Sequence, residues 1–454
     1  MEKKKKGFSY YRLFIVVGII ALISVIFILV GIHNAGDSEN LAAVFGKGTF
    51  IHSETVYLVL LLALVLPIVL IVMTVTIAKE RFGFILFRPK KDEDEGVRFR
   101  ALVGLDRTMK EHTAPVYNTT ISLDRMCEDL RNFAASKLQL YYEPEDIRKF
   151  IAGFGVSHLM VMQGLSGTGK TSLATAIGEY LGNRSTVVSV QPMWKERSDV
   201  IGYFNEFTKK FNESTLLKTL YEARFTDDIY VIVLDEMNIA RVEYYFADFL
   251  SLMELDARNR YLEMTSDTWP EDPQLFESGR FRLPENVWFI GTANNDDSTF
   301  AISDKVYDRA MVMNLDRKAQ PFIAPESAGA AIPFSYFQWL VDSAKKMYQM
   351  SPAIREKVAE FDRFMIEKYH ITYGNRIRKQ MEEYVSVYIA CGGAEEEALD
   401  DFLVKKLLRK LEGQNPVVMA KAGGVIANRL DELFGENSMP QCREYLQYLR
   451  QLAS

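Results

Sequence analysis

The sequence predicts an α/β fold, an αβα sandwich built on a parallel β-sheet, with a helical domain after it. Continuous apolar runs over residues 158–162, 229–234 and 287–294 are typical of strands buried on both faces of such a sheet. The first run leads through a glycine-rich turn into a segment, residues 172–181, with the apolar spacing of a helix. Two longer apolar runs near the N-terminus predict a pair of membrane-spanning helices ahead of the sandwich.

The membrane spans are predicted at residues 13–32 and 56–78. Both runs lack charged residues and are long enough to cross a ~30 Å hydrocarbon layer at about 1.5 Å per residue. Basic residues precede the first run and follow the second, whereas the loop over 33–55 has a single lysine, Lys47. This asymmetry predicts an integral protein of the plasma membrane with both termini in the cytoplasm. A cleaved signal peptide is the alternative for the first run, but its apolar stretch is longer than usual, and the second run would still anchor the chain.

Residues 88–142 are expected to connect this membrane hairpin, residues 1–87, to the sandwich. Residues 88–120 have the charge and proline content of a juxtamembrane linker, in which Arg98–Leu105 could still form a short strand. Apolar residues at helical spacing predict an amphipathic helix over 121–140. Pro144 stands at a favourable helix start, and Gly153 would end this second helix.

The most informative stretch is residues 164–171, which read Gly-Leu-Ser-Gly-Thr-Gly-Lys-Thr. This is the spacing of a phosphate-binding loop between a strand and a helix, where backbone N–H groups and the helix N-terminus bind phosphate oxygens. Lys170 would reach the β- and γ-phosphates of a nucleotide, and the Thr171 hydroxyl would bind Mg²⁺. The predicted nucleotide-binding residues here are Gly164, Leu165, Ser166, Gly167, Thr168, Gly169, Lys170, Thr171 and Ser172.

Two acidic residues, Asp235 and Glu236, follow the second apolar run. The C-terminal end of a buried parallel strand lies at the edge of the sheet where ligands bind, beside the phosphate-binding loop. Asp235 would hold Mg²⁺ through water, and Glu236 would orient and deprotonate the attacking water. An exposed Asp-Glu turn without chemistry is the alternative, which the nearby phosphate-binding loop disfavours.

The third run ends at Asn294, which would contact the γ-phosphate and the attacking water, and Arg309 follows a short helical pattern after it. A strand, Asp-Glu, a strand ending in Asn and a helix ending in Arg together resemble the pattern of AAA+ ATPases. Within that family, residues 191–205, 235–241 and 291–297 resemble the dynein-related branch, and most of all the McrB-type restriction motors and the MoxR-like ATPases. The resemblance covers roughly residues 140–410.

The resemblance implies roles for two of these residues. Asn294 would be the sensor-1 asparagine of the family. Arg309 falls where the family has its arginine finger, which inserts into the site of the neighbouring subunit and stabilises transition-state charge. A surface arginine paired with Asp308 or Asp304 is the alternative for Arg309.

The resemblance also implies a division of the chain into an AAA+ core, residues 143–320, and a helical lid with further C-terminal helices, residues 321–454. Helical patterns cover 334–342, 351–369, 376–390 and 399–411. Arg376 resembles the sensor-2 arginine at the start of a lid helix, which would bind nucleotide, with Arg378 as the fallback. A basic helix face is the ordinary alternative.

Two insertions are expected to carry the working surface of the motor. Residues 191–205 follow a core strand and hold Trp194 among charges. Residues 259–286 have two short β-like arms around a polar turn, which suggests a hairpin. In related motors a hairpin at this place faces the central channel of the ring, and a solvated loop is the alternative.

Composition limits the remaining possibilities. The net charge of −6 over 454 residues and the lack of a basic tail give no direct evidence for nucleic-acid binding. Cys127, Cys391 and Cys442 lack metal-ligand spacing and are typical of free thiols in a reducing compartment.

Together these features predict a membrane-anchored AAA+ nucleoside triphosphatase that hydrolyses ATP with Mg²⁺. It would work in a homo-oligomeric ring, a hexamer by resemblance, and remodel a partner protein that the sequence does not identify. Two alternatives stay open. A McrB-like motor subunit would use GTP or ATP to drive a separate nuclease of a restriction-type defence system. A nucleotide-gated membrane scaffold would bind nucleotide with little turnover.

Overall fold

The computed structural model describes residues 96–294, 299–436 and 438–452. The chain divides into two units, residues 1–95 and 96–454, and all described residues belong to the second. The two predicted membrane spans, 13–32 and 56–78, lie outside the described residues. In the part of the chain that the structure describes, no helix has both the length and the apolar character needed to cross a membrane.

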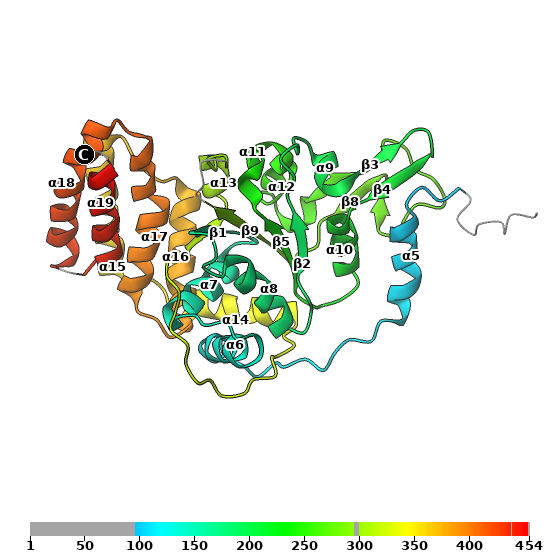
Figure 1. The fold of residues 1–454 in the computed structure, drawn as a ribbon, viewed down its shortest axis with the longest axis horizontal. Helices are drawn as coiled ribbons and strands as arrows, with labels where there is room; N and C mark the ends of the chain where they lie inside the picture. Colours follow the sequence, from blue (N-terminus) through cyan, green and yellow to red (C-terminus); the bar gives the residue numbers. More distant parts are fainter. Residues whose placement is uncertain (1–95, 295–298, 437, 453–454) are drawn as a thin grey trace, which may run out of the picture. The chain divides into compact units, whose positions relative to one another are not determined.

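A five-stranded, all-parallel sheet forms the centre of the described unit (Figure 1). Its strand order is β10-β1-β9-β5-β2, so the chain crosses over the sheet between neighbouring strands. The predicted apolar runs form its central strands and are buried along most of their length. The five strands are β1 Leu159–Gly164, β2 Thr186–Ser189, β5 Tyr230–Asp235, β9 Val287–Asn294 and β10 Met311–Asn314.

The two faces of this sheet belong to different hydrophobic clusters, because side chains alternate along a strand. Met160 and Met162 of β1 pack in one cluster with α6 Leu123–Leu138, α7 Pro144–Val156 and α8 Lys170–Tyr180. Leu159 and Val161 pack in the other cluster. Helices of that second layer are α9 Arg197–Ile201, α10 Thr215–Ala223, α11 Val242–Tyr245 and α12 Ala247–Leu252. The predicted αβα sandwich is therefore confirmed, as are the predicted helices over 121–140 and from Pro144. The end predicted at Gly153 is wrong, because α7 continues to Val156.

Two small antiparallel sheets are present: one begins in the predicted insertion 191–205 and extends beyond it, and the other lies within 259–286. The first is a hairpin of β3 Gly202–Asn205 and β4 Lys210–Glu213. The second has the order β6-β8-β7, with β6 Tyr261–Glu263, β7 Phe276–Glu277 and β8 Arg280–Arg282. The hairpin expected within 259–286 is thus present as the β6–β8 pair, with β7 as an additional short strand.

The possible short strand at Arg98–Leu105 is wrong, because Arg100–Thr108 forms helix α5. Leu102 and Asp106, one helical turn apart, are its buried residues, which is a helical and not an alternating pattern. Residues ahead of α5 are also packed into the fold: Phe99 is fully buried and stacks on Phe211 of β4 with ring centroids 4.8 Å apart. The expected linker therefore ends before this segment, which belongs to the compact unit.

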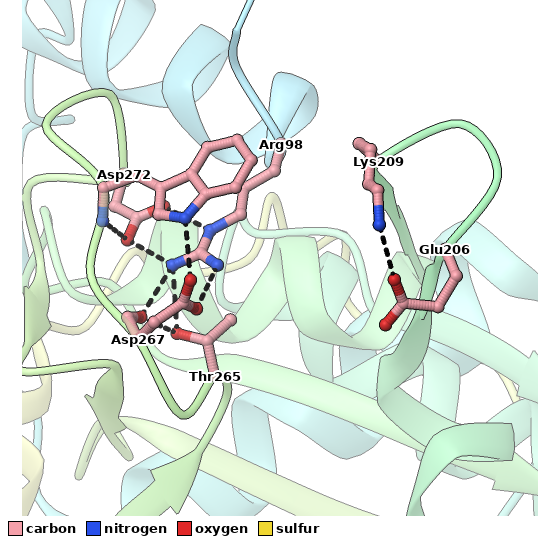
Figure 2. A network of polar contacts seen from close by, with 7 residues as sticks. Arg98, Glu206, Lys209, Thr265, Asp267 and Asp272 are labelled. Atoms are coloured by element: carbon pink, nitrogen blue, oxygen red, sulfur yellow. Dashed lines mark hydrogen bonds and ion pairs between the residues drawn. The ribbon is translucent and has the colours of Figure 1, made fainter.

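Arg98 joins this segment to the second insertion (Figure 2). Its guanidinium donates two hydrogen bonds of 2.7 Å to the carboxylate of Asp272 and one of 2.6 Å to Asp267. It also stacks over the ring of Trp269, 4.8 Å from the centroid. Only 3% of the Arg98 side chain is exposed. The hydrogen bonds to Asp272 raise the pKa of Arg98 although burial opposes them, so the guanidinium stays charged.

A helical domain follows the sheet. Its helix α16 packs along α7, and the approach is close: a Cβ on Gly155 of α7 would lie 3.2 Å from the Cγ1 of Val387. Helices occur in all four predicted ranges, although the last range, 399–411, is divided between α17 and η4. The helices of the domain are α14 Phe334–Met347, α15 Pro352–Tyr369, α16 Asn375–Ala390, α17 Glu395–Lys406, α18 Pro416–Phe434 and α19 Pro440–Leu452. Shorter elements are η1 Met109–Glu111, η2 Met237–Ile239, η3 Ala257–Asn259, η4 Leu408–Gly413 and α13 Asp304–Tyr307.

Candidate nucleotide-binding site

The phosphate-binding loop joins β1 to α8. Gly167 and Gly169 have φ angles of +75° and +96°, which side chains rarely adopt, and Gly169 caps the N-terminus of α8. Lys170 is 6% exposed, and its ammonium donates to the carbonyl oxygens of Gly164 and Leu165 at 2.9 and 2.7 Å. The lysine charge is thus held at the mouth of the loop, where phosphate oxygens can replace the carbonyls.

Gly164 marks the closest approach of this loop to the edge of the sheet. Its φ is +138°, and a Cβ there would lie 2.6 Å from the carbonyl oxygen of Leu315, just after β10. Parallel pairing between β1 and β9 also sets Gly164 beside Asn294. The sheet therefore brings the predicted sensor asparagine to the start of the loop.

Asp235, at the end of β5, is connected through its Oδ1 atom to β9 and to α8, the helix that follows the loop. The hydroxyl of Thr171 donates to it at 2.8 Å, and the hydroxyl of Thr292 on β9 donates at 2.8 Å. Thr292 in turn accepts a 3.0 Å hydrogen bond from the backbone N–H of Glu236. Glu236 has a φ of +52°, an uncommon conformation for a side-chain-bearing residue. These hydrogen bonds thus hold the Asp-Glu pair in place at the carboxyl end of β5.

The oxygen atoms of Thr171 and Asp235 fit Mg²⁺, a hard cation that binds oxygen ligands and keeps several waters. Hydroxyl and carboxylate already meet at 2.8 Å. Other sites are not evident: among the residues that the structure describes, no group of three or more His, Cys, Asp or Glu side chains could hold a metal ion.

Arg309 lies at the opposite end of the sheet from the loop. Its carbonyl oxygen accepts a 3.0 Å hydrogen bond from Ser157, which precedes β1. At about 3.3 Å per residue, the six residues of β1 span about 20 Å between this point and the loop. The Arg309 guanidinium pairs with Glu254 and donates to the carbonyl oxygens of Leu250 and Lys305. Arg309 therefore cannot reach the phosphate-binding loop of its own chain.

Arg376 lies beside Arg309. Its Nη2 atom is 2.8 Å from the Oε1 of Glu254, the same carboxylate oxygen that pairs with Arg309. The structure thus groups the predicted lid arginine with the predicted arginine finger, at the start of α16. Arg378, the fallback, is exposed two residues further along that helix. The roles predicted for both residues stay predictions.

Three residues that the sequence reasoning missed support the site. Thr292, described above, is a polar residue inside an otherwise apolar strand, and this break in the apolar pattern could have indicated its role in the site. Asn238 is 4% exposed and donates a 2.8 Å hydrogen bond to the carbonyl oxygen of Asn294, which ties η2 to the end of β9. Tyr142 donates at 3.1 Å to the carbonyl oxygen of Gly169 in the loop, and burial raises the pKa of its hydroxyl. Nothing in the sequence around Tyr142 indicates this contact.

Comparisons with known proteins agree with this geometry. Residues 159–310 match the model of the AAA domain of the dynein-related subfamily, and residues 330–453 match a domain of unknown function, DUF8727. The chain is 25% identical over 177 residues to the McrB subunit of the type IV methyl-directed restriction enzyme EcoKMcrB of Escherichia coli K12, covering 36% of each chain. It thus spans about a third of that relative's length.

The chain is also similar to the solved structure of a candidate ATPase from Cytophaga hutchinsonii ATCC 33406. The alignment covers 73% of this chain and 96% of that one. Its sequence identity of 12% and TM-score of 0.43 are too low to decide the fold. The phosphate-binding loop, the Asp-Glu strand and the strand that ends in Asn294 all lie within the matched residues 159–310. These similarities support an AAA+ ATPase of the McrB/MoxR-like type for the sheet and its phosphate-binding loop.

Proposed function

We propose that the chain is a membrane-anchored nucleoside triphosphatase that hydrolyses ATP in a homo-oligomeric ring, a hexamer, and remodels a partner protein. One observation carries the proposal: Lys170, Thr171, Asp235 and Glu236 gather at the carboxyl edge of the sheet, whereas Arg309 lies at the other end of β1. These groups cannot meet on one nucleotide within a single chain. They meet when two copies associate head to tail, and repetition of such a contact closes a ring.

In this mechanism the loop N–H groups and Lys170 bind the β- and γ-phosphates. Thr171 and Asp235 would hold Mg²⁺, which would neutralise charge on the phosphate oxygens. Glu236 accepts a proton from water as the water oxygen bonds to the γ-phosphorus and the bond to the β-phosphate oxygen breaks. Asn294 orients that water.

The neighbouring copy completes the site with Arg309. For this, the guanidinium must leave Glu254 and bind the γ-phosphate, because the two anions compete for the same donors. An arginine supplied in trans contributes about 10³–10⁵-fold to the rate in related phosphoryl transfers.

Nucleotide turnover by the full chain tests this proposal. ATP and GTP are offered separately across a series of protein concentrations, with Glu236→Gln and Arg309→Ala variants beside the wild type. We expect turnover per chain to rise with concentration and to collapse in both variants. Tight nucleotide binding without turnover at any concentration would contradict the proposal and favour a nucleotide-gated scaffold.

A second candidate is the motor subunit of a restriction-type defence system. The similarity to the E. coli McrB subunit favours it, although the match covers only part of either chain. A preference for GTP, together with turnover stimulated by methylated duplex DNA, would favour this candidate. Turnover that is indifferent to DNA would favour the remodelling ATPase.

The membrane anchor is part of the proposal and rests on the apolar runs at 13–32 and 56–78. Alkaline extraction of cell membranes tests it. The full chain is expected to stay in the membrane pellet, and its release into the supernatant would contradict the anchor.

A further inference from the structure

The segment that carries Arg309 is held by the C-terminal helical domain rather than by the sheet alone. Lys406, the last residue of α17, is 2% exposed. Its ammonium donates to the carbonyl oxygens of Tyr307 and Ala310 at 2.6 and 2.5 Å, and to the side-chain oxygen of Gln380 at 3.2 Å. These two carbonyls lie on either side of Arg309, so one buried cation fixes the turn on which the arginine stands.

Other residues of the same domain hold this segment as well. Gln380 of α16 donates to the carbonyl oxygen of Arg309 at 3.4 Å. Arg409 of η4 stacks over the ring of Tyr307 at 3.8 Å and pairs with Asp304 at 2.6 Å. Elements α16, α17 and η4 therefore all contact the segment 304–310.

Burying an ammonium group costs free energy, because the charge loses its hydration. Burial lowers the pKa of Lys406 to about 7, with Asp308 opposing this shift and Arg409, Lys410 and Arg376 adding to it. An apolar side chain would fill the same volume without this cost. The three oxygen acceptors thus give Lys406 a specific task, which is to fix the backbone around Arg309.

Arg309 also contacts α12 and the turn that follows it. Its guanidinium donates to the carbonyl oxygen of Leu250 in α12 and pairs with Glu254, just after that helix. The arginine therefore stands between the segment that follows Glu236 and the helical domain. A displacement of either one changes where its guanidinium points.

Resting on the proposed function, we propose that Lys406 is a positioning residue that fixes Arg309 to the C-terminal helical domain.

Steady-state turnover of the full chain, with nucleotide binding measured separately, tests this. Lys406→Met should lower kcat about 10–100-fold while KM for ATP changes less than about twofold, since misplacement of a catalytic group by about 1 Å costs a rate factor of this size. Lys405→Met is the matched control. Lys405 is also buried in α17, but its ammonium pairs with Asp401, away from Arg309. Its turnover is expected within about threefold of the wild type.

A double-variant cycle separates positioning from general damage. If Lys406 acts through Arg309, the double variant Lys406→Met/Arg309→Ala should be no slower than Arg309→Ala alone, within about twofold. A further loss in the double variant, or equal turnover of Lys406→Met and Lys405→Met, would overturn the proposal. Should Lys406→Met fail to fold, Gln380→Leu replaces it, with a smaller loss of kcat expected and again no added loss beside Arg309→Ala. If Arg309→Ala itself turns over like the wild type, the proposed function fails and this inference fails with it.

Discussion

The Arg98 cluster gives a quantitative prediction about how the segment ahead of α5 is attached. In Arg98→Met the apolar stem keeps its packing, but the guanidinium that binds Asp272 and Asp267 is lost (Figure 2). Asp272 is 9% exposed and would remain as a buried carboxylate without its cation. Removing one partner of a buried ion pair costs about 3–5 kcal/mol.

The lower end of this range applies. Asp267 is 60% exposed and regains water, and Asp272 retains a 2.9 Å hydrogen bond from the backbone N–H of Trp269. We therefore expect Arg98→Met to lower the free energy of unfolding by about 3 kcal/mol. The same picture contains a matched control, the exposed ion pair of Lys209 with Glu206 at 2.8 Å (Figure 2). Lys209→Met should cost no more than about 0.5 kcal/mol.

Urea denaturation of the full chain, followed by tryptophan fluorescence and by circular dichroism, measures both variants. The double variant Arg98→Met/Asp272→Asn adds a second check, because it removes the uncompensated charge and should recover part of the lost stability. An Arg98→Met variant as stable as Lys209→Met would refute the reasoning. It would mean that this segment is not held by the guanidinium.

Three further predictions follow from the contacts of the sheet. Gly291→Ala should lower the free energy of unfolding, measured by thermal denaturation, by about 1–3 kcal/mol, because the added Cβ would lie 1.9 Å from the Sδ of Met237. Adding Met237→Ala should recover part of this loss. Burial lowers the pKa of His158 to about 4. As pH falls from about 6.5 to 4, the His158 side chain therefore gains a proton in the unfolded chain but not in the folded one. Stability should therefore fall with pH in that window, by at most about 3 kcal/mol, and His158→Phe should flatten the fall measured by urea denaturation. Thr292→Val removes the hydroxyl that donates to Asp235 and accepts from the backbone N–H of Glu236. We expect kcat to fall about 10–100-fold, while nucleotide affinity measured by titration stays within about threefold.

The sequence predicted the parallel sheet well because its signals are local. Strand β9 was predicted at 287–294 and forms Val287–Asn294, since a continuous apolar run can only be buried on both faces. The phosphate-binding loop and the Asp-Glu pair follow such runs directly, and parallel pairing then brings their ends together. The residues of the nucleotide site follow these strands directly in the sequence. Their place in the sequence therefore also fixes where they lie at the edge of the sheet.

Contacts between distant charged residues were not predictable in this way. The charge and proline content of residues 88–120 predicted a linker that included Arg98, and nothing in the nearby sequence indicates that Asp272 is its partner. Lys406 likewise lies within the helix predicted over 399–411, and only the packing of α17 buries it. The shared carboxylate of Glu254 depends on three separate elements meeting, which no sequence pattern records.

The central claim is that Arg309 completes the site of a neighbouring copy, and mixing two inactive variants tests it most directly. Glu236→Gln keeps its arginine but lacks the base, whereas Arg309→Ala keeps the base but lacks the arginine. Mixed in equal amounts under assembling conditions, they should recover about a quarter of wild-type turnover, because one site in four then pairs an intact base with a neighbour's intact arginine. A mixture that stays as inactive as either variant alone, although the two co-assemble, would contradict the claim.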